Sequence, residues 1–272
     1  MAEDDFDTGD LFQDPEGFYP EEAPPSFAEH QMLCGKMVRV RLVGSHPLYG
    51  NLLWNAGRTS SHYIEERTDK LLRDKDVLEI GAAAGVPSIV SAIQGARTVV
   101  MTDYPDLDLV QNMQYNADLA IDMIPKRADS QKRLHVEGYK WGNPVEPLLE
   151  HLPPATEDTL PGFDVLIMAD VIYNYPEHGN LVKTMQQTLK KTPEAVALVI
   201  FTPYEPWLLP QTERFFPLAE TGGFTVTKVF EKLMGTVLFE NDPGDERLRR
   251  TVFGYELRWS PDQLSGNASE SA

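Results

Sequence analysis

The stretch VLEIGAAAGVP, residues 77–87, decides the fold of this chain. Apolar residues followed at once by a glycine and a run of small residues indicate a buried strand that ends in a sharp turn. Residues 88–95 continue with a helical pattern, so the unit is a strand, a small-residue loop and a helix. No side chain larger than a methyl group precedes Val86 in this loop, so another molecule can approach its backbone closely. A tight turn without a ligand gives the same pattern, and the rest of the sequence has to separate the two interpretations.

Composition and charge exclude several classes of protein. The 272 residues are 42% hydrophobic and 10% aromatic, as in a soluble globular protein, and their net charge is −18. That charge argues against a nucleic-acid surface, because such binding depends on neutralising phosphates, and it would attract a basic partner. The single cysteine, Cys34, excludes an internal disulfide and fits a reducing compartment. The start has no apolar signal segment, and the longest apolar run, 195–201, is too short to cross a bilayer. We therefore expect a cytoplasmic protein with no nucleic-acid and no membrane partner, and a nuclear location is also open. We further expect a monomer.

The chain divides into three parts. Residues 1–30 hold ten acidic residues and no Lys or Arg, so they form an acidic arm. Such a segment is usually a solvated tail. Four aromatic residues between its prolines fit equally well an extended arm that docks on the core: Phe12, Phe18, Tyr19 and Phe27. We expect one core domain over residues 31–262 and a frayed tail over 263–272.

Alternation of strands and helices predicts the fold class. Residues 37–53 alternate around a turn at 44–47 and predict a β-hairpin, and residues 59–66 predict a helix start with Ser60 or Ser61 as its N-cap. The strands then expected are 77–80, 98–102, 134–139, 163–169, 195–201, 224–231 and 251–259, and the helices are 88–95, 107–121, 181–191 and 207–221. This order is typical of an α/β, Rossmann-like, doubly wound, mostly parallel seven-stranded sheet. The last two strands have no long helix between them and predict an antiparallel edge, with the hairpin as an amino-terminal cover.

The carboxyl ends of the first two core strands indicate the kind of ligand. In an open parallel sheet these ends share one edge, and here they carry the small-residue loop and Asp103. A phosphate-binding P-loop is excluded because no lysine follows Gly85, and a dinucleotide site is disfavoured because, of its three glycine positions, only Gly81 is glycine. S-adenosylmethionine carries no phosphate. Its binding requires close approach to a backbone, an acid for the ribose and a flat wall for adenine. Glu79 and the loop 81–85 fit the first requirement, Asp103 the second and Trp141 the third.

A metal site is not expected. The histidines at 46, 62, 135, 151 and 178 show no metal-binding spacing, and the chain has only one cysteine that could serve as a further ligand.

Several motifs resemble those of a known family. EIGAAAG at 79–85, TDYPD at 102–106 and ADVIYN at 169–174 resemble motifs of the seven-stranded class I methyltransferases, and within them of family 16, which modifies protein lysines. LLWNAG at 52–57 extends the resemblance, which covers nearly the whole chain except its last ten or so residues. One departure is Ala83, which stands at the usual middle glycine of the first motif and leaves the course of the loop beside the methionine half open.

The resemblance implies a role for each matching position. Trp54 would line the methionine side of S-adenosylmethionine, and Glu79 would bond the amides of the loop against which the cofactor lies. Asp103 would take the ribose hydroxyls, and Ala169 would lie beside the sulfonium. The complete set implied for the cofactor is Trp54, Glu79, Gly81, Ala82, Ala83, Gly85, Asp103, Tyr104, Trp141 and Ala169. The implied catalytic, acceptor-side residues are Asp170, Tyr173 and Asn174.

Structural roles are the alternative for several of these residues. A tryptophan at a strand end often packs in a core, and Asp170 could cap a helix or pair with a lysine. Asp103 could also cap the helix after it, although Asp106 is better placed for that. Tyr204 fits an acceptor pocket or plain packing equally well.

The resemblance also implies a substrate. It is the α-amino group of translation elongation factor 1-alpha, a glycine exposed after removal of the initiator Met, together with the adjacent lysine. An internal lysine of another protein and a non-catalytic, cofactor-binding scaffold remain the alternatives.

Overall fold

The computed structural model describes residues 23–44, 50–129, 131–154 and 161–265 of the chain. Most of the acidic arm, three of its four aromatic residues, most of the expected turn at 44–47 and the end of the tail lie outside these ranges. Within them, no helix is both long and apolar enough to cross a bilayer.

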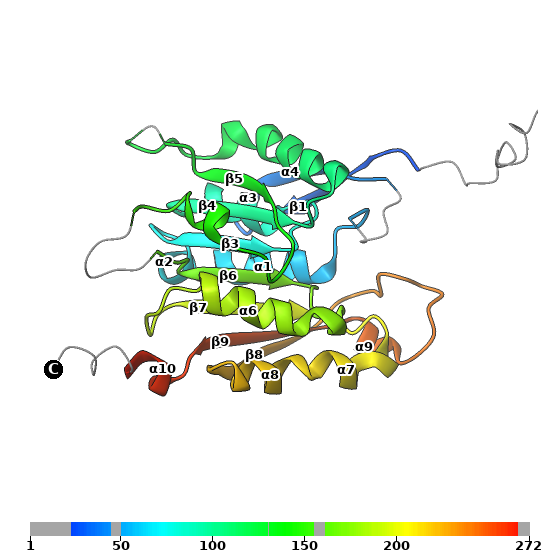
Figure 1. Cartoon of the computed structure of the whole chain (residues 1–272). Helices are drawn as coiled ribbons and strands as arrows, with labels where there is room; N and C mark the ends of the chain where they lie inside the picture. The colour runs from blue at the N-terminus through cyan, green and yellow to red at the C-terminus, as the bar shows by residue number, and fades with distance from the viewer. Residues whose placement is uncertain (1–22, 45–49, 130, 155–160, 266–272) are drawn as a thin grey trace, which may run out of the picture.

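One mostly parallel sheet organises the molecule (Figure 1). Its strands lie in the order β5 (Leu134–Gly138), β4 (Thr98–Asp103), β3 (Asp76–Ile80), β6 (Val165–Ala169), β7 (Val196–Phe201), β9 (Thr251–Trp259) and β8 (Phe224–Leu233). The first five in that order run parallel, whereas β9 is antiparallel to both of its neighbours. The predicted doubly wound sheet with an antiparallel edge is therefore confirmed.

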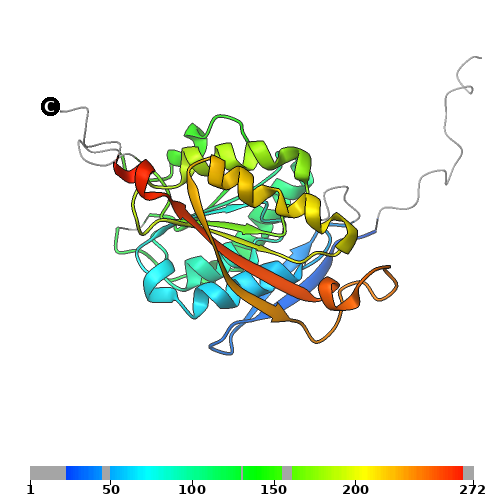
Figure 2. The same ribbon diagram turned by 90° about the horizontal axis from the view of Figure 1, so that it is seen from below.

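Helices cover both faces of the sheet. The α-helices are α1 (Asn55–Glu65), α2 (Thr68–Leu71), α3 (Val86–Ile93), α4 (Leu107–Leu119), α5 (Glu146–Leu149), α6 (His178–Thr188), α7 (Leu209–Glu213), α8 (Phe215–Thr221), α9 (Glu246–Arg249) and α10 (Pro261–Ser265). Successive strand residues point to opposite faces. Accordingly, Val77 belongs to the core beneath α1, α3 and α4, whereas Leu78 belongs to the core beneath α6 and α8. Figure 2 shows α6 and α8 on one side of the sheet and α1 on the other.

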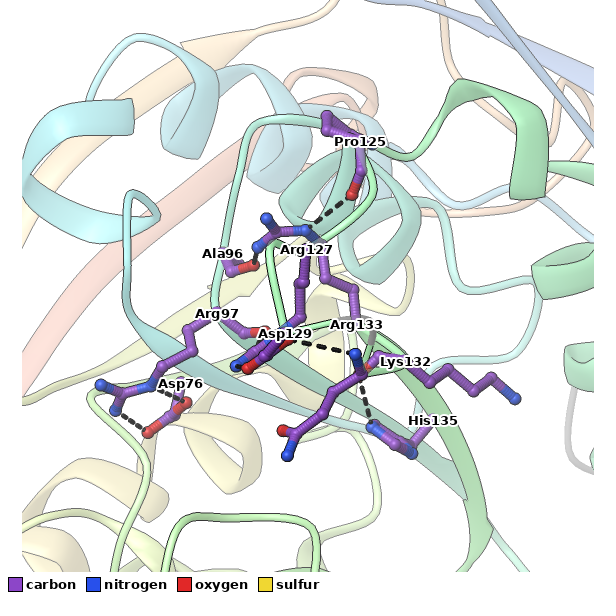
Figure 3. A network of polar contacts seen from close by, with 10 residues as sticks. Asp76, Ala96, Arg97, Pro125, Arg127, Asp129, Lys132, Arg133 and His135 are labelled. Atoms are coloured by element: carbon purple, nitrogen blue, oxygen red, sulfur yellow. Dashed lines mark hydrogen bonds and ion pairs between the residues drawn. The ribbon is translucent and has the colours of Figure 1, made fainter.

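A network of arginines fastens the amino-terminal edge of the sheet (Figure 3). Arg97, just before β4, forms an ion pair with the buried carboxylate of Asp76 at the start of β3. Arg133, just before β5, donates to backbone carbonyls on two other segments, at Ala96 and Pro125. These contacts hold β3, β4 and β5 together at the edge opposite their carboxyl ends, where the candidate site lies.

The predicted hairpin is wrong in its pairing. Met37–Leu42 does form a strand, β2, but its antiparallel partner is the preceding β1 (Ser26–Gln31), and the turn lies over residues 32–36. Gly35 permits that turn with a φ of +85°. The last five residues of the expected arm are therefore part of a strand. The hairpin packs its buried valines, Val38 and Val40, against the core beneath α1, α3 and α4.

The predicted start of the first helix is also wrong. The helix begins at Asn55, and Ser60 and Ser61 are buried inside it rather than capping it. Its own N-cap residue, Trp54, makes no side-chain capping bond. The unpaired amides of its first turn are satisfied by residues from other elements, described below.

Two smaller differences concern the last third of the chain. The helix expected over 207–221 is divided into the short 3-10 helix η4 (Pro206–Leu208), α7 and α8. The first residues of the expected frayed tail, 263–265, belong to α10.

The topology places a crevice near β3 and β6. The chain runs outward from β3 to β4 and β5 and then returns to β6 on the other side of β3. Ligands of open α/β sheets bind outside the carboxyl ends of the strands at such a reversal.

Candidate active site

A cavity of about 810 Å³ opens at the carboxyl ends of β3, β4, β6 and β7. Ten of the thirteen residues predicted for the site line it: Trp54, Gly81, Ala83, Asp103, Tyr104, Trp141, Ala169, Asp170, Tyr173 and Asn174. The other three, Glu79, Ala82 and Gly85, are buried and stand outside the lining that the described residues form. The predicted residues therefore do come together from distant parts of the sequence.

Asp103, at the end of β4, fixes the small-residue loop. One of its carboxylate oxygens accepts a hydrogen bond from the amide of Ala83 at 2.7 Å, and the other accepts from the amide of Tyr104 at 2.7 Å. The loop bends through left-handed backbone at Gly81, with a φ of +73°, and at Ala83, with a φ of +49°. The cap of α4 is Asp106, which accepts from the amide of Asp108, as predicted. Asp103 is therefore positioned on the cavity wall rather than used as a helix cap.

Glu79 does not bond the amides of the loop, contrary to the prediction. Its Oε2 accepts from the amide of Ser88 at 2.9 Å and from the Ser88 hydroxyl at 2.5 Å. Ser88 lies in the first turn of α3, whose N-cap, Gly85, has no side chain to offer. The first amides of a helix have no partner within the helix, so a side-chain oxygen from another element can bond them. Glu79 therefore caps α3 from β3, and burial raises its pKa to about 8 despite the two hydrogen bonds from Ser88.

Asp170 joins three elements at the cavity. It follows directly on β6, with its backbone in the left-handed region at a φ of +52°. Its Oδ1 accepts from the amide of Thr202 after β7 at 2.8 Å, and its Oδ2 accepts from the amide of Ala56 in the first turn of α1 at 3.2 Å. Burial raises the pKa of Asp170 to about 7, although these hydrogen bonds favour the ionised form. Non-glycine residues in this region of φ often mark functional sites.

Tyr204 completes the capping of α1. Its hydroxyl accepts from the amide of Asn55 at 3.2 Å, so the first two amides of α1 are bonded by side chains from other elements. Burial, and then the charge of Asp170, raise the pKa of the Tyr204 hydroxyl well above its usual range. Tyr204 packs beside α1 and also lines the cavity, and its role in an acceptor pocket stays a prediction.

Three aromatic rings form one wall of the cavity. The ring centroids of Trp54 and Tyr204 lie 5.0 Å apart in an edge-to-face arrangement, and the ring of Phe239 lies 5.8 Å from each of them. Phe239 comes from the connection between β8 and β9. The buried Arg249 in α9 donates to its carbonyl at 2.7 Å and so holds this connection against the wall.

The lining is acidic as well as aromatic. Five carboxylate side chains and one lysine line the cavity: Asp103, Asp170, Glu177, Glu205, Asp242 and Lys140. Nine aromatic side chains share the lining. Aromatic faces and carboxylates both attract cations, so a positively charged amine fits this cavity.

Sequence reasoning missed the contribution of the segment between β8 and β9. Phe239, Asp242 and Pro243 line the cavity, although the sequence of this segment suggests only a connection. The one available signal was the short apolar run over residues 237–239, which ends in Phe239 just before a polar stretch. Trp207 and Thr202, which also line the cavity, carry no motif of their own.

Comparison with known proteins identifies the family. The profile of a family described as lysine methyltransferase matches residues 44–206, more than half of the chain. The chain belongs to this lysine methyltransferase family. A protein N-terminal and lysine N-methyltransferase from Emericella nidulans is 74% identical over 259 residues, which cover 95% of this chain and 98% of that relative. Another, from Schizosaccharomyces pombe, is 36% identical over 94% of this chain and 98% of that relative.

Solved structures agree on the fold of this lysine methyltransferase family member. The 16S rRNA N2 G1207 methyltransferase of T. thermophilus, solved with AdoMet and guanosine, matches with a TM-score of 0.50. The match covers 89% of this chain and 52% of that chain at 16% sequence identity. At that identity the likeness concerns the fold alone, which is the methyltransferase form of the Rossmann-like sheet.

Replacing Glu79 with Gln should change how stability depends on pH. The folded-state pKa of about 8 lies above the unfolded value, so the folded protein retains a proton that the unfolded chain has lost. The stabilising contribution is complete below about pH 4.5 and is lost as the pH rises to about 8. Over that window the retained proton makes the free energy of unfolding of the unmodified protein fall with pH. In E79Q this contribution is absent, so we expect its slope to be less negative than that of the unmodified protein by about 1.4 kcal/mol per pH unit. Urea unfolding of both proteins at several pH values measures the two slopes, and equal slopes would contradict the assignment.

Proposed function

We propose that this protein is an S-adenosylmethionine-dependent methyltransferase acting on the amino terminus of translation elongation factor 1-alpha. Its acceptors are the α-amino group of the first glycine and the adjacent lysine. Membership of the lysine methyltransferase family, and relatives named protein N-terminal and lysine N-methyltransferases, support a protein amine as the acceptor. The observation that carries the proposal is that the loop with Asp103 and the aromatic, acidic wall belong to one cavity.

The end of the cavity formed by β3 and β4 fits the cofactor. Gly81 and Ala83 present small side chains beside Asp103, whose two oxygens offer about four acceptor positions in total. Bonds from two backbone amides orient this carboxylate toward a ribose. Tyr104 and Trp141 supply flat surfaces for adenine, and the cavity volume of about 810 Å³ lies in the range of ligand sites. When bound, S-adenosylmethionine supplies an electrophilic methyl group.

The wall formed by Trp54, Tyr204 and Phe239 fits the acceptor amine. A protonated amine over an aromatic face gains about 0.5–2 kcal/mol, and more when it is desolvated. Asp170 and Tyr173 line the same cavity, and the Asp170 carboxylate is fixed by a hydrogen bond from the amide of Ala56. Both side chains can therefore orient the amine. The resemblance gives Trp54 the methionine side of the cofactor, and Trp54 also belongs to this aromatic wall. We therefore propose that Trp54 lies at the boundary between cofactor and acceptor.

The chemistry requires an amine that has lost its proton. An α-amino group has a pKa of about 7.7–8.0 and is partly neutral near pH 7, whereas a lysine near 10.4 is not. Asp170, with a pKa of about 7, is ionised above that pH and can hold the amine while the proton leaves to water. Alignment contributes more to such a displacement than acid–base catalysis does. Asn174 offers an amide oxygen in the same lining.

Partner and location follow from the same proposal. The net charge of −18 favours a basic protein terminus as partner, and the single Cys34 is consistent with the cytoplasm.

The test of the proposed function is mass spectrometry of elongation factor 1-alpha after incubation with this protein and isotope-labelled S-adenosylmethionine. We expect labelled methyl groups on the first residue and on the adjacent lysine. The matched control is the same factor with its α-amino group acetylated, which should lose the label on the first residue. Label only on an internal lysine would replace the proposal by the internal-lysine alternative, and no label at all would favour a scaffold.

Replacing Phe239 with Leu should weaken acceptor binding. The substitution keeps an apolar side chain but removes the aromatic face, so the KM for an amino-terminal peptide should rise by about 2–30-fold. The affinity for S-adenosylmethionine should stay unchanged. The matched variant Tyr104→Leu, at the other end of the cavity, should weaken cofactor binding instead and leave the peptide KM nearly unchanged. Steady-state kinetics and calorimetry of both variants measure this, and the reverse pattern would contradict the assignment of the two ends.

A further inference from the structure

A second cluster of titratable side chains lies where the hairpin β1–β2 packs on α1. It consists of His30 in β1 and of His62 and Glu65 in α1. Each residue offers one ligand atom, and these atoms all lie within 4.8 Å of one another. None of the three lines the cavity described above. His62 and Glu65 are three residues apart in the helix, so their side chains share one face.

His30 is the least accessible member of the cluster. Its side chain is almost completely buried, at 1% exposure. Its Nε2 is among the few buried side-chain atoms of the described residues that have no hydrogen-bond partner. A buried polar atom without a partner costs about 1–3 kcal/mol. A ligand at this position would remove that cost.

The other two side chains are held as metal ligands are. The Nε2 of His62 lies 2.9 Å from the carbonyl oxygen of Gln31. Because a carbonyl can only accept, Nε2 carries the hydrogen, and the lone pair of a neutral imidazole is then on Nδ1. Metal-binding histidines are usually oriented by such a bond from their other nitrogen. The Glu65 carboxylate is fixed by the amide of Leu33, at 3.2 and 3.3 Å, and by the side chain of Gln94 at 3.2 Å.

The charge of the cluster suits a divalent cation. Two imidazoles and one carboxylate face one another here. Neutral imidazole and carboxylate are the forms that bind metals. Arg58, whose Nη1 donates to the carbonyl of Glu29, is the opposing cation nearby and will limit the affinity.

We propose that His30, His62 and Glu65 form a binding site for a divalent transition metal, with zinc as the preferred ion. Two histidines and one glutamate form a three-ligand zinc set that leaves a fourth position for water. Around a tetrahedral zinc with bonds of about 2.0–2.1 Å the ligand atoms are about 3.3 Å apart, so the side chains must close in by small rotations. The ion would join the hairpin to α1 and thereby stabilise the amino-terminal cover. His30 and His62 are far apart in the sequence and meet only in the fold, which explains why histidine spacing predicted no metal site.

The test is a zinc titration of the untagged, chelator-treated full chain by isothermal calorimetry, followed by thermal unfolding with and without zinc. We expect one zinc ion per chain and a higher unfolding temperature in its presence, because zinc binds only the folded site. His62→Ala should weaken zinc binding at least tenfold. Glu65→Gln, which keeps an acceptor for the amide of Leu33, should do the same and provides a second variant should His62→Ala fail to fold.

The matched control is a second histidine pair in the same chain. His135 and His151 stack with ring centroids 4.3 Å apart, and His151 bonds Glu137 at 2.7 Å. His151→Ala should leave zinc binding and the thermal shift unchanged. The proposal is overturned if the chain binds no zinc, if binding persists in both cluster variants, or if only His151→Ala abolishes it. None of these outcomes depends on methyl transfer.

Discussion

The site depends on one carboxylate, that of Asp170, which is shared among three elements. It follows β6, accepts from the backbone after β7 and accepts from the first turn of α1. Helix N-termini leave amides unpaired, and α1 has no capping side chain of its own. In the same way, Glu79 in β3 accepts a hydrogen bond from the amide of Ser88 in the first turn of α3. Two carboxyl groups, one in β3 and one directly after β6, therefore bond the first turns of the helices beside the cavity, and burial raises the pKa of both.

This arrangement links the fold to the proposed chemistry. The residue that anchors α1 also lines the cavity, so the position of Trp54, just before that helix, depends on it. Tyr204 has the same double function, since it bonds α1 and forms an aromatic wall with Trp54 and Phe239. The same residues therefore both cap α1 and line the cavity. The family gives the reaction class, and the cavity supplies the physical reason for an amine acceptor.

The sequence predicted what local patterns encode. The five parallel strands, the loop after β3 and the cap at Asp106 follow from apolar runs, glycines and N-cap chemistry, and the structure confirms them. The predictions were wrong where residues that are distant in the sequence determine the local structure. The start of α1 is fixed by side chains more than a hundred residues away, and β1 lies in a segment whose acidity suggests a tail. Phe239 lies in a segment between β8 and β9, and its carbonyl accepts a hydrogen bond from Arg249, ten residues further along the chain.

The central claim, that a buried Asp170 carboxylate holds α1 to β6 and β7, can be measured through its hydrogen-bond donors. The amide protons of Ala56 and Thr202 donate to its two oxygens, so their NMR chemical shifts should report its ionisation. We predict that both shifts change with pH at one common midpoint near 7, and that both changes vanish in Asp170→Asn. Two flat titrations, or midpoints near that of an ordinary aspartate at about 3.9, would contradict the account.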